Sequence, residues 1–326
     1  MIRTLTRFSL HVTAAVVLLL PAAGALAQAQ YPTRPIRLLT SFAPGGGSDI
    51  LARLLGPQVA DALGQQIVVD NRPGGGGTLG AGIAVQAAPD GYTMILVSGS
   101  YGANPALHKL TYDSVNDITP FILIGETGLI ATIFPKSPIR TVSDLIAHAR
   151  ANPGKLLFGS AGSGGLGHLA QELFKLQTKI DITHIPYKGS GPVMTALLSG
   201  EVHSSFSSVV PSIPHLKAGR LRAIGVTPPR RIRALPDVPT INETVPGFEV
   251  VHWYGIWGPK GIPREIVMRL NKEFAAVLAT GAMKQWFAAE GMEPAGGPPE
   301  QFHDRIKTDV EKWKRLVKEA NIKVTL

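Results

Sequence analysis

The sequence predicts an α/β protein of two lobes that are joined by hinge strands and enclose a cleft. The first observation is a unit of strand, glycine loop and helix, which occurs in residues 36–98 and returns in residues 156–226. The second is a pair of extended, mostly apolar stretches, 121–134 and 248–257, that separate the two units along the chain. The third is a C-terminus with two amphipathic helices, which need a surface to cover. Two crossings between two α/β units are typical of a hinged pair of domains.

Residues 1–27 are predicted to be a secretory signal peptide. Arg3 and Arg7 give a positive start, an apolar run follows, and Ala25-Leu26-Ala27 has the small residues of a cleavage site. The apolar run is too short and wrongly flanked for a transmembrane helix. We therefore expect cleavage near Ala27, a mature chain that begins near Gln28, and export from the cytoplasm.

The composition argues against several kinds of site. The 326 residues include no cysteine, which rules out disulfide bonds, thiol catalysis, thiolate metal sites and a lipid-anchoring cysteine. The net charge of +9 is scattered along the chain. Its tightest cluster, Arg230-Arg231-Ile232-Arg233, has no interleaved aromatic residues, so we expect no nucleic-acid partner. No spacing of histidines and carboxylates indicates a metal site.

The elements of the first unit follow from periodicity and stop signals. Ser48 is expected to cap a helix that runs to Leu63, with apolar residues on one side and Gly64 as the stop. The nearly all-apolar run 92–98 is typical of a buried parallel strand. The other predicted elements here are strands over 36–42 and 67–69 and a helix over 78–88.

The second unit repeats the pattern. Thr141 is expected to cap a helix over 142–151, with Asp144 at the capping-box position. The other predicted elements are strands over 156–159, 182–186, 206–210 and 221–226 and helices over 167–178 and 192–199.

The C-terminal helices, predicted over 263–279 and 299–319, are expected to cover the first lobe. We therefore predict that residues 28–125 and 251–326 form lobe 1 and residues 126–250 form lobe 2.

Two glycine loops carry the predicted chemistry, since each follows a strand and opens a helix. Glycine at the end of a parallel strand lets a ligand reach the backbone, and the helix offers unpaired N–H groups and a positive dipole end. One helix terminus stabilises an anion by about 0.3–1 kcal/mol, far from the ~8 kcal/mol of a micromolar ligand, so both loops are needed. The pattern predicts a carboxylate between Gly45-Gly46-Gly47-Ser48 and Ser160-Ala161-Gly162-Ser163-Gly164, unless both loops are ordinary tight turns.

Other interpretations of these loops remain open. Gly75-x-Gly77-x-x-Gly80 and Gly162-x-Gly164-x-x-Gly167 match a dinucleotide pattern, but each lacks the acid expected about twenty residues later. Ser160 or Ser163 with His168 and Asp181 could serve a secreted serine hydrolase, although neither serine lies in Gly-x-Ser-x-Gly. His168 is more simply explained as a first-turn histidine that hydrogen-bonds the loop. We expect no enzymatic activity and no cofactor.

Seven motifs occur in a characteristic order along nearly all of the mature chain. They are Tyr31-Pro32-Thr33-Arg34-Pro35-Ile36, Phe42-Ala43-Pro44-Gly45-Gly46, Asp70-Asn71-Arg72-Pro73-Gly74, Pro89-Asp90-Gly91-Tyr92-Thr93, Asn104-Pro105, His184-Ile185-Pro186-Tyr187-Lys188-Gly189 and Leu235-Pro236-Asp237-Val238-Pro239-Thr240. Together they resemble the Bug-type extracytoplasmic solute receptors of tripartite tricarboxylate transporters.

The resemblance implies a type II periplasmic-binding-protein (Venus-flytrap) fold whose lobes close on a small carboxylate. It also implies a periplasmic monomer that delivers its ligand to membrane transporter subunits. The ligand-binding residues that it implies are Phe42, Ala43, Gly45, Gly46, Ser48 and Asp49 in the first loop and Ser160, Ala161, Gly162, Ser163, Gly164 and His168 in the second. Tyr187 and Ser207 are further candidates. Tyr101, Trp253 and Tyr254 either line the cleft as apolar walls or pack at the hinge, and Asp49 is also explained by a helix N-terminus alone.

One departure from the family pattern bears on the ligand. Family members often carry acids in the segment after Gly200-Glu201-Val202, whereas residues 203–208 of this chain contain none. A ligand ammonium would need a buried carboxylate partner. We therefore expect a carboxylate without an ammonium group, namely a di- or tricarboxylate or an aromatic acid. A sensory receptor that presents the same ligand to a signalling protein remains an alternative function.

Overall fold

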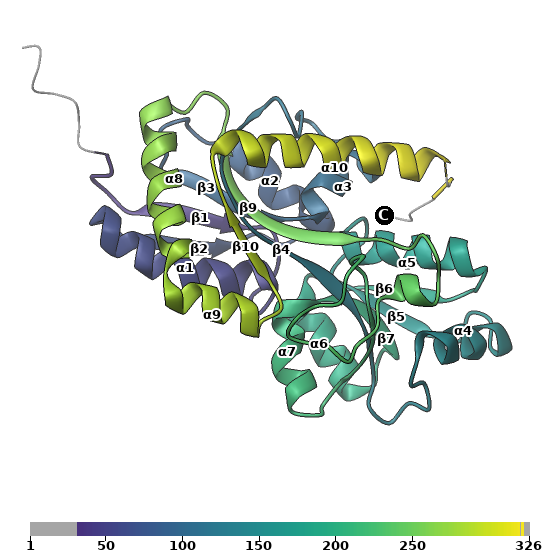
Figure 1. Ribbon diagram of the computed structural model, residues 1–326. Coiled ribbons are helices and arrows are strands. Elements are labelled where there is room, and N and C mark those ends of the chain that lie inside the picture. The colour runs from purple at the N-terminus through teal and green to yellow at the C-terminus, as the bar shows by residue number, and fades with distance from the viewer. Residues whose placement is uncertain (1–30, 320, 323–326) are drawn as a thin grey trace, which may run out of the picture.

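The computed structural model describes residues 31–319 and 321–322, and the predicted signal peptide lies outside them. The chain forms two α/β lobes, as the sequence predicts, and the long strand β4 (Ile118–Ile133) runs through both (Figure 1). Lobe 1 contains the first part of the described chain and most of its C-terminal part, and lobe 2 is built mainly from the middle, coloured teal and green. The last described residues pack against the lobe 2 core.

Lobe 1 is built on a mixed sheet in the order β2-β1-β3-β9-β4. Strands β1, β2 and β3 are parallel, β9 pairs antiparallel with β3 and β4, and β10 pairs with the other edge of β4. Besides β4, the strands are β1 (Ile36–Thr40), β2 (Ile67–Asn71), β3 (Thr93–Ser98), β9 (Val251–Pro259) and β10 (Glu293–Gly296).

Helices cover both faces of this sheet because its central strands are apolar on both sides. Met94 and Leu96 of β3 belong to the core under α1, α8 and α9, whereas Ile95 and Val97 belong to the core under α2, α3 and α10. The helices are α1 (Gly47–Leu63), α2 (Thr78–Val85), α3 (Ser100–Leu107), α8 (Arg264–Ala279), α9 (Gly281–Ala289) and α10 (Pro299–Glu319), with a 3₁₀ turn η1 (Gly75–Gly77) before α2.

Lobe 2 has a smaller sheet in which β4 pairs with β7 and β8, β7 with β5, and β5 with β6. Thr141 accepts a hydrogen bond from Asp144 N and forms the predicted capping box of α4. The strands are β5 (Leu157–Ser160), β6 (Thr183–Pro186), β7 (Ser204–Ser208) and β8 (Arg222–Val226). The helices are α4 (Val142–Ala151), α5 (Leu166–Thr178), α6 (Ser190–Ser199) and α7 (Val209–Lys217), with a 3₁₀ turn η2 (Ile241–Glu243).

The connection between the lobes follows from the pairing of β4. Its residues 118–128 pair with β9 in the lobe 1 sheet, and its residues 129–133 pair with β7 and β8 in the lobe 2 sheet. The C-terminal helix α10 also reaches both lobes. Phe302 and Ile306 lie in the lobe 1 core, as expected, but Trp313 belongs to the buried cluster of lobe 2.

Several expectations about single elements were wrong. The strand expected over 206–210 ends at Ser208, and Val209 and Val210 begin α7. Ser48 does not cap α1, because the helix begins at Gly47 and Gly46 is its N-cap residue. Helices α3 and α9 were not expected at all. Within the described residues, no helix is long and apolar enough to cross a membrane.

Candidate functional site

The two glycine loops line one cavity, and the lobes touch around it. The backbone N–H of Ala43 donates to the carbonyl oxygen of Lys188 at 3.1 Å, which joins lobe 1 to lobe 2. The backbone N–H of Leu166 donates to Ser100 Oγ at 3.0 Å, which makes a second bridge. The structure therefore represents a closed form of the two lobes.

A cavity of about 30 Å³ lies between the loops. Its wall includes seven serines but no Asp, Glu, Lys or Arg, so it offers hydroxyl and backbone groups without a formal charge. The lining residues are Phe42, Gly46, Gly47, Ser48, Ser98, Ser100, Leu129, Ala161, Gly165, Leu166, Gly167, Ser190, Val193, Ser205, Phe206, Ser207, Ser208, His252 and Tyr254.

The N-termini of five helices meet at this cavity. First residues of α1, α3, α5 and α6 and the N-cap residue of α7 all belong to its wall. None of the five helices has a side-chain hydrogen bond at its N-cap. The first N–H groups of a helix have no partner within the helix, and its dipole places a partial positive charge there. The cavity is thus suited to an anion although no basic side chain lines it.

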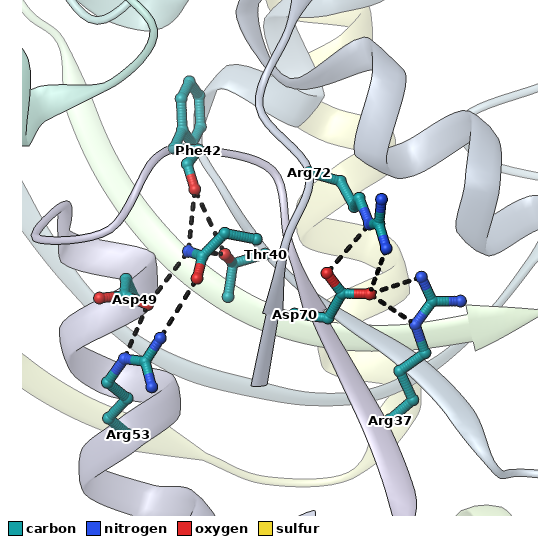
Figure 2. A network of polar contacts seen from close by, with 8 residues as sticks. Arg37, Thr40, Phe42, Asp49, Arg53, Asp70 and Arg72 are labelled. Carbon is teal, nitrogen blue, oxygen red and sulfur yellow. Dashed lines mark hydrogen bonds and ion pairs between the residues drawn. The ribbon is translucent and has the colours of Figure 1, made fainter. Parts of the chain in front are cut away.

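Asp49 supports the first loop from inside α1 (Figure 2). Its Oδ2 accepts a hydrogen bond from the backbone N–H of Gly45 at 3.0 Å, and its Oδ1 accepts from Arg53 Nε at 3.0 Å. Asn71 Nδ2 donates to the same Oδ1 and to the carbonyl oxygen of Phe42, both at 3.0 Å. Since these groups occupy the carboxylate, Asp49 acts here on the shape of the loop.

A second carboxylate next to this loop is held by two arginines (Figure 2). Arg37 Nη2 donates to Asp70 Oδ2 at 2.6 Å, and Arg72 Nη2 donates to the same oxygen at 3.0 Å. Burial raises the pKa of Asp70, but the hydrogen bonds from Arg72 and Arg37 outweigh it and lower this pKa below its usual value. These contacts fix β2, which carries Asn71 into position under the loop.

Two stacked histidines brace the second loop. The rings of His168 and His184 lie 3.5 Å apart, centroid to centroid, and 14° from parallel. His168 Nδ1 accepts a hydrogen bond from Gly164 N at 3.2 Å, which confirms that this histidine bonds the loop. Burial, then His184 and Lys175, lower the pKa of His168 to about 3, and burial and Lys175 lower that of His184 to about 4. Both rings are therefore neutral near pH 7.

The serine contacts differ from those of the hydrolase alternative. Ser160 Oγ lies 2.6 Å from Nε2 of His184, not of His168, and accepts from Gly162 N at 3.2 Å. In the part of the chain that the structure describes, no hydrogen bond or ion pair joins Asp181 to His168. The predicted set of nucleophile, base and orienting acid does not form.

The hinge strand β9 supplies the far wall of the cavity. His252 and Tyr254 are 3% and 1% exposed and line it, and their rings pack edge to face with centroids 4.7 Å apart. Burial, then Arg305, lower the pKa of His252 to about 3. Burial also raises the pKa of Tyr254, so both groups are neutral.

The predicted site residues divide into two groups. Those that line the cavity are Phe42, Gly46, Ser48, Ala161 and Ser207; those that do not are Ala43, Gly45, Asp49, Tyr101, Ser160, Gly162, Ser163, Gly164, His168 and Tyr187. Tyr101 lies in the lobe 1 core, where its hydroxyl donates to the carbonyl oxygen of Ser114 at 2.9 Å. The hydroxyl of Tyr187 donates to Glu201 Oε1 at 2.7 Å. Which of these residues touch a ligand stays a prediction.

Sequence reasoning missed four serines of the cavity wall and His252. Ser98 and Ser100 flank the start of α3, Ser190 begins α6, and Ser205 lies on β7. The available signal was a serine directly at the carboxyl end of a strand, as in Ser98-Gly99-Ser100, because such ends lie at one edge of a sheet. His252 had no comparable signal.

Known proteins match this chain over most of its length. The family model described as "Tripartite tricarboxylate transporter family receptor" matches residues 51–322. Protein BugT of Bordetella pertussis is 35% identical over 298 residues, which cover 90% of this chain and 91% of BugT.

Two solved structures share both sequence and fold with the chain. Rpa4515 of R. palustris, solved with adipate, is 36% identical with a TM-score of 0.86, covering 90% of this chain and 99% of its own. MatC (Rpa3494) from Rhodopseudomonas palustris, solved with bound malate, is 31% identical with a TM-score of 0.83, covering 88% of this chain and 100% of its own.

Proposed function

Because the chain belongs to the tripartite tricarboxylate transporter receptor family, we propose that it captures a small organic carboxylate in the cleft between its lobes. Proteins of this family are solute-binding receptors and not enzymes. The structures with adipate and malate support a carboxylate as the class of ligand for this chain as well.

The observation that carries the proposal is the meeting of five helix N-termini, none of them capped by its own N-cap side chain, at one uncharged, serine-lined cavity. One helix terminus contributes about 0.3–1 kcal/mol to an anion and up to ~2 kcal/mol when partly buried. Several termini with charge-assisted hydrogen bonds approach the ~8 kcal/mol of a micromolar ligand. A carboxylate that bridges α1 and α5 makes both sets of contacts only when the lobes are closed, so it favours the closed form.

The ligand in this proposal has no ammonium group. Ser205, Ser207 and Ser208 stand in the wall where an ammonium would need an acid, and the described lining contains no Asp or Glu. A buried ammonium without such a partner is strongly disfavoured. Di- or tricarboxylates and aromatic acids therefore fit better than amino acids.

The remaining parts of the proposal concern the whole receptor. Residues 28–125 and 251–326 move as lobe 1 and residues 126–250 as lobe 2, after removal of a signal peptide near Ala27 and export to the periplasm. The closed receptor works as a monomer, since one chain supplies both sides of the cleft. It then delivers the ligand to membrane transporter subunits, as the family description implies.

A thermal-shift screen of residues 28–326 against carboxylates, amino acids and nucleotides, followed by calorimetry, tests the proposal. A ligand at a hundred times its dissociation constant adds about 2.7 kcal/mol of stability. Stabilisation by carboxylates alone, with the ligand recovered unchanged, supports the receptor. Stabilisation by amino acids or nucleotides instead, or consumption of a bound ester, contradicts it.

A further inference from the structure

We propose that His252 and Tyr254 of β9, with Ser205 of β7, form a hinge-strand anchor that binds a second oxygen-bearing group of the ligand. Through this anchor the receptor prefers a dicarboxylate to the monocarboxylate of the same length. The inference rests on the proposed function, because it concerns the same cavity and assumes that one carboxylate is held at the helix N-termini.

The first argument is the direction of the two rings. Alternate residues of a strand point to opposite faces, so His252 and Tyr254 share one face and Trp253 takes the other. Trp253 packs edge to face on Phe302 in the lobe 1 core, with centroids 5.4 Å apart. His252 and Tyr254 instead line the cavity, and both side chains are almost fully buried.

The second argument is that these side chains have no hydrogen-bond partner. Both ring nitrogens of His252, the hydroxyl of Tyr254 and Ser205 Oγ are buried and unpaired within the described residues. The hydroxyl of Ser208 lies close enough to lower the pKa of Tyr254 against the larger effect of burial, but the pair falls outside the geometric limits of a hydrogen bond. Buried polar groups in proteins are nearly always paired. Four unpaired atoms, from three side chains that line one binding cavity, therefore point to a ligand that pairs them.

Neighbouring hydroxyls of the same cavity wall do have hydrogen-bond partners. Ser207 Oγ lies 3.1 Å from Thr132 Oγ1, and Ser190 Oγ lies 3.3 Å from Ser208 Oγ. Ser100 Oγ accepts from Leu166 N across the lobes. Lack of a partner is therefore not a general property of the hydroxyls that line the closed cavity.

The third argument is the chemistry of the space between the two rings and the helices. The Tyr254 hydroxyl lies against the backbone of Gly47, because a Cβ built on Gly47 would lie 2.0 Å from the hydroxyl oxygen. Nδ1 of His252 lies 3.1 Å from the position of a Cβ on Gly99. The anchor therefore lies beside the first turns of α1 and α3, whose positive ends favour an oxygen anion. A tyrosine hydroxyl and a neutral imidazole both donate to such an oxygen.

A comparison of matched acids tests the anchor. Calorimetry measures succinate against butyrate and adipate against hexanoate, for the full mature chain and for Tyr254→Phe, Ser205→Ala and His252→Phe. In the wild type we expect the diacid to bind more tightly in at least one pair. Tyr254→Phe removes only an oxygen, and we expect it to reduce that preference at least tenfold while the monoacid affinity is kept. The melting temperature without ligand should not fall, because no hydrogen bond is lost.

Tyr31→Phe is the matched control, because the hydroxyl of Tyr31 donates to the carbonyl oxygen of Gly91 at 2.7 Å, outside the cavity. It should lower the melting temperature and keep the preference. If diacid and monoacid weaken equally in the anchor variants, or the preference survives in all three, the anchor is wrong while carboxylate binding stands. If the wild type binds diacid and monoacid equally in both pairs, or binds none of the four acids while another carboxylate stabilises it in the thermal-shift screen, the anchor is wrong and the proposed function stands. If no carboxylate stabilises it at all, both fail.

Discussion

Replacing Gly191 with alanine should prevent full closure of the lobes without harming either lobe. Gly191 lies in the first turn of α6, and a Cβ there would meet the carbonyl oxygen of Pro44 in lobe 1 at 2.6 Å. Ordinary van der Waals contact begins near 3.4 Å, and the Pro44 oxygen belongs to the backbone, so no flexible side chain can move aside to relieve the clash. The contact exists only between the lobes, so the open form accepts the methyl group.

The size of the effect follows from the cost of overpacking. An extra methyl group in a closely packed contact costs about 1–3 kcal/mol, which corresponds to a ligand affinity weaker by roughly 5- to 150-fold. The unfolding free energy should stay the same or rise by up to about 1 kcal/mol, because alanine favours a helix more than glycine does. Calorimetry measures the affinity, urea unfolding the stability, and small-angle X-ray scattering the compaction caused by ligand.

Gly82→Ala is the matched control. Gly82 also lies in a helix, α2, and no heavy atom lies within 4 Å of the position of its Cβ. This variant should bind ligand as the wild type does. Wild-type affinity and compaction in Gly191→Ala would refute the reasoning, because they would mean that the lobes do not approach this closely around the ligand.

Three further outcomes are expected. On acidification from pH 7 to pH 5.5 the free energy of unfolding should fall, because burial lowers the pKa of His168 and His252 to about 3 and that of His184 to about 4. In the unfolded chain these histidines take up protons near pH 6.5, whereas in the folded protein they do not, so each lowers the free energy of unfolding by up to about 1.4 kcal/mol per pH unit below that value. Urea unfolding midpoints that stay constant between pH 7 and pH 5.5 would contradict this. Asn71→Ala should lower the free energy of unfolding by about 1–2 kcal/mol and weaken ligand binding, because the Asn71 amide donates to both Phe42 O and Asp49 Oδ1. An unchanged ligand affinity would show that the first loop keeps its shape without these hydrogen bonds. Ser100→Ala should weaken ligand binding about fivefold, because the Ser100 hydroxyl accepts a hydrogen bond from Leu166 in the other lobe only when the lobes are closed. The free energy of unfolding of the open form should not change. Equal affinities of variant and wild type in calorimetry would show that this hydrogen bond does not stabilise the closed form.

Local signals in the sequence predict much of the fold. The capping box of Thr141 and Asp144, the apolar strand β3 and the glycine that ends α1 depend on residues a few positions apart, and the structure agrees with each of them. The misplaced elements arise where a strand passes into a helix without a polar linker. Val209 and Val210 are β-branched and follow β7 directly, yet tertiary packing places them in the first turn of α7.

The candidate site is less predictable because it depends on contacts between distant segments. The loop residues Phe42, Gly46 and Ala161 could be predicted from the strand–glycine loop–helix pattern. His252 could not, since it reaches the cavity only through the pairing of β9 with β3 and β4. The contacts between the closed lobes likewise have no local signal, because their glycines meet residues far away along the chain, as Gly191 meets Pro44 and Gly76 meets Ser163.

The central claim is that helix N-termini bind the charge of a carboxylate without a basic side chain. The most direct measurement is calorimetry of the mature receptor with the tightest-binding carboxylate and with the uncharged amide of the same compound. Two helix termini at about 1–2 kcal/mol each predict that the amide binds about 100-fold more weakly, or worse. Equal affinities for the acid and the amide would contradict the account, because the site would then recognise shape and hydrogen bonds but not charge.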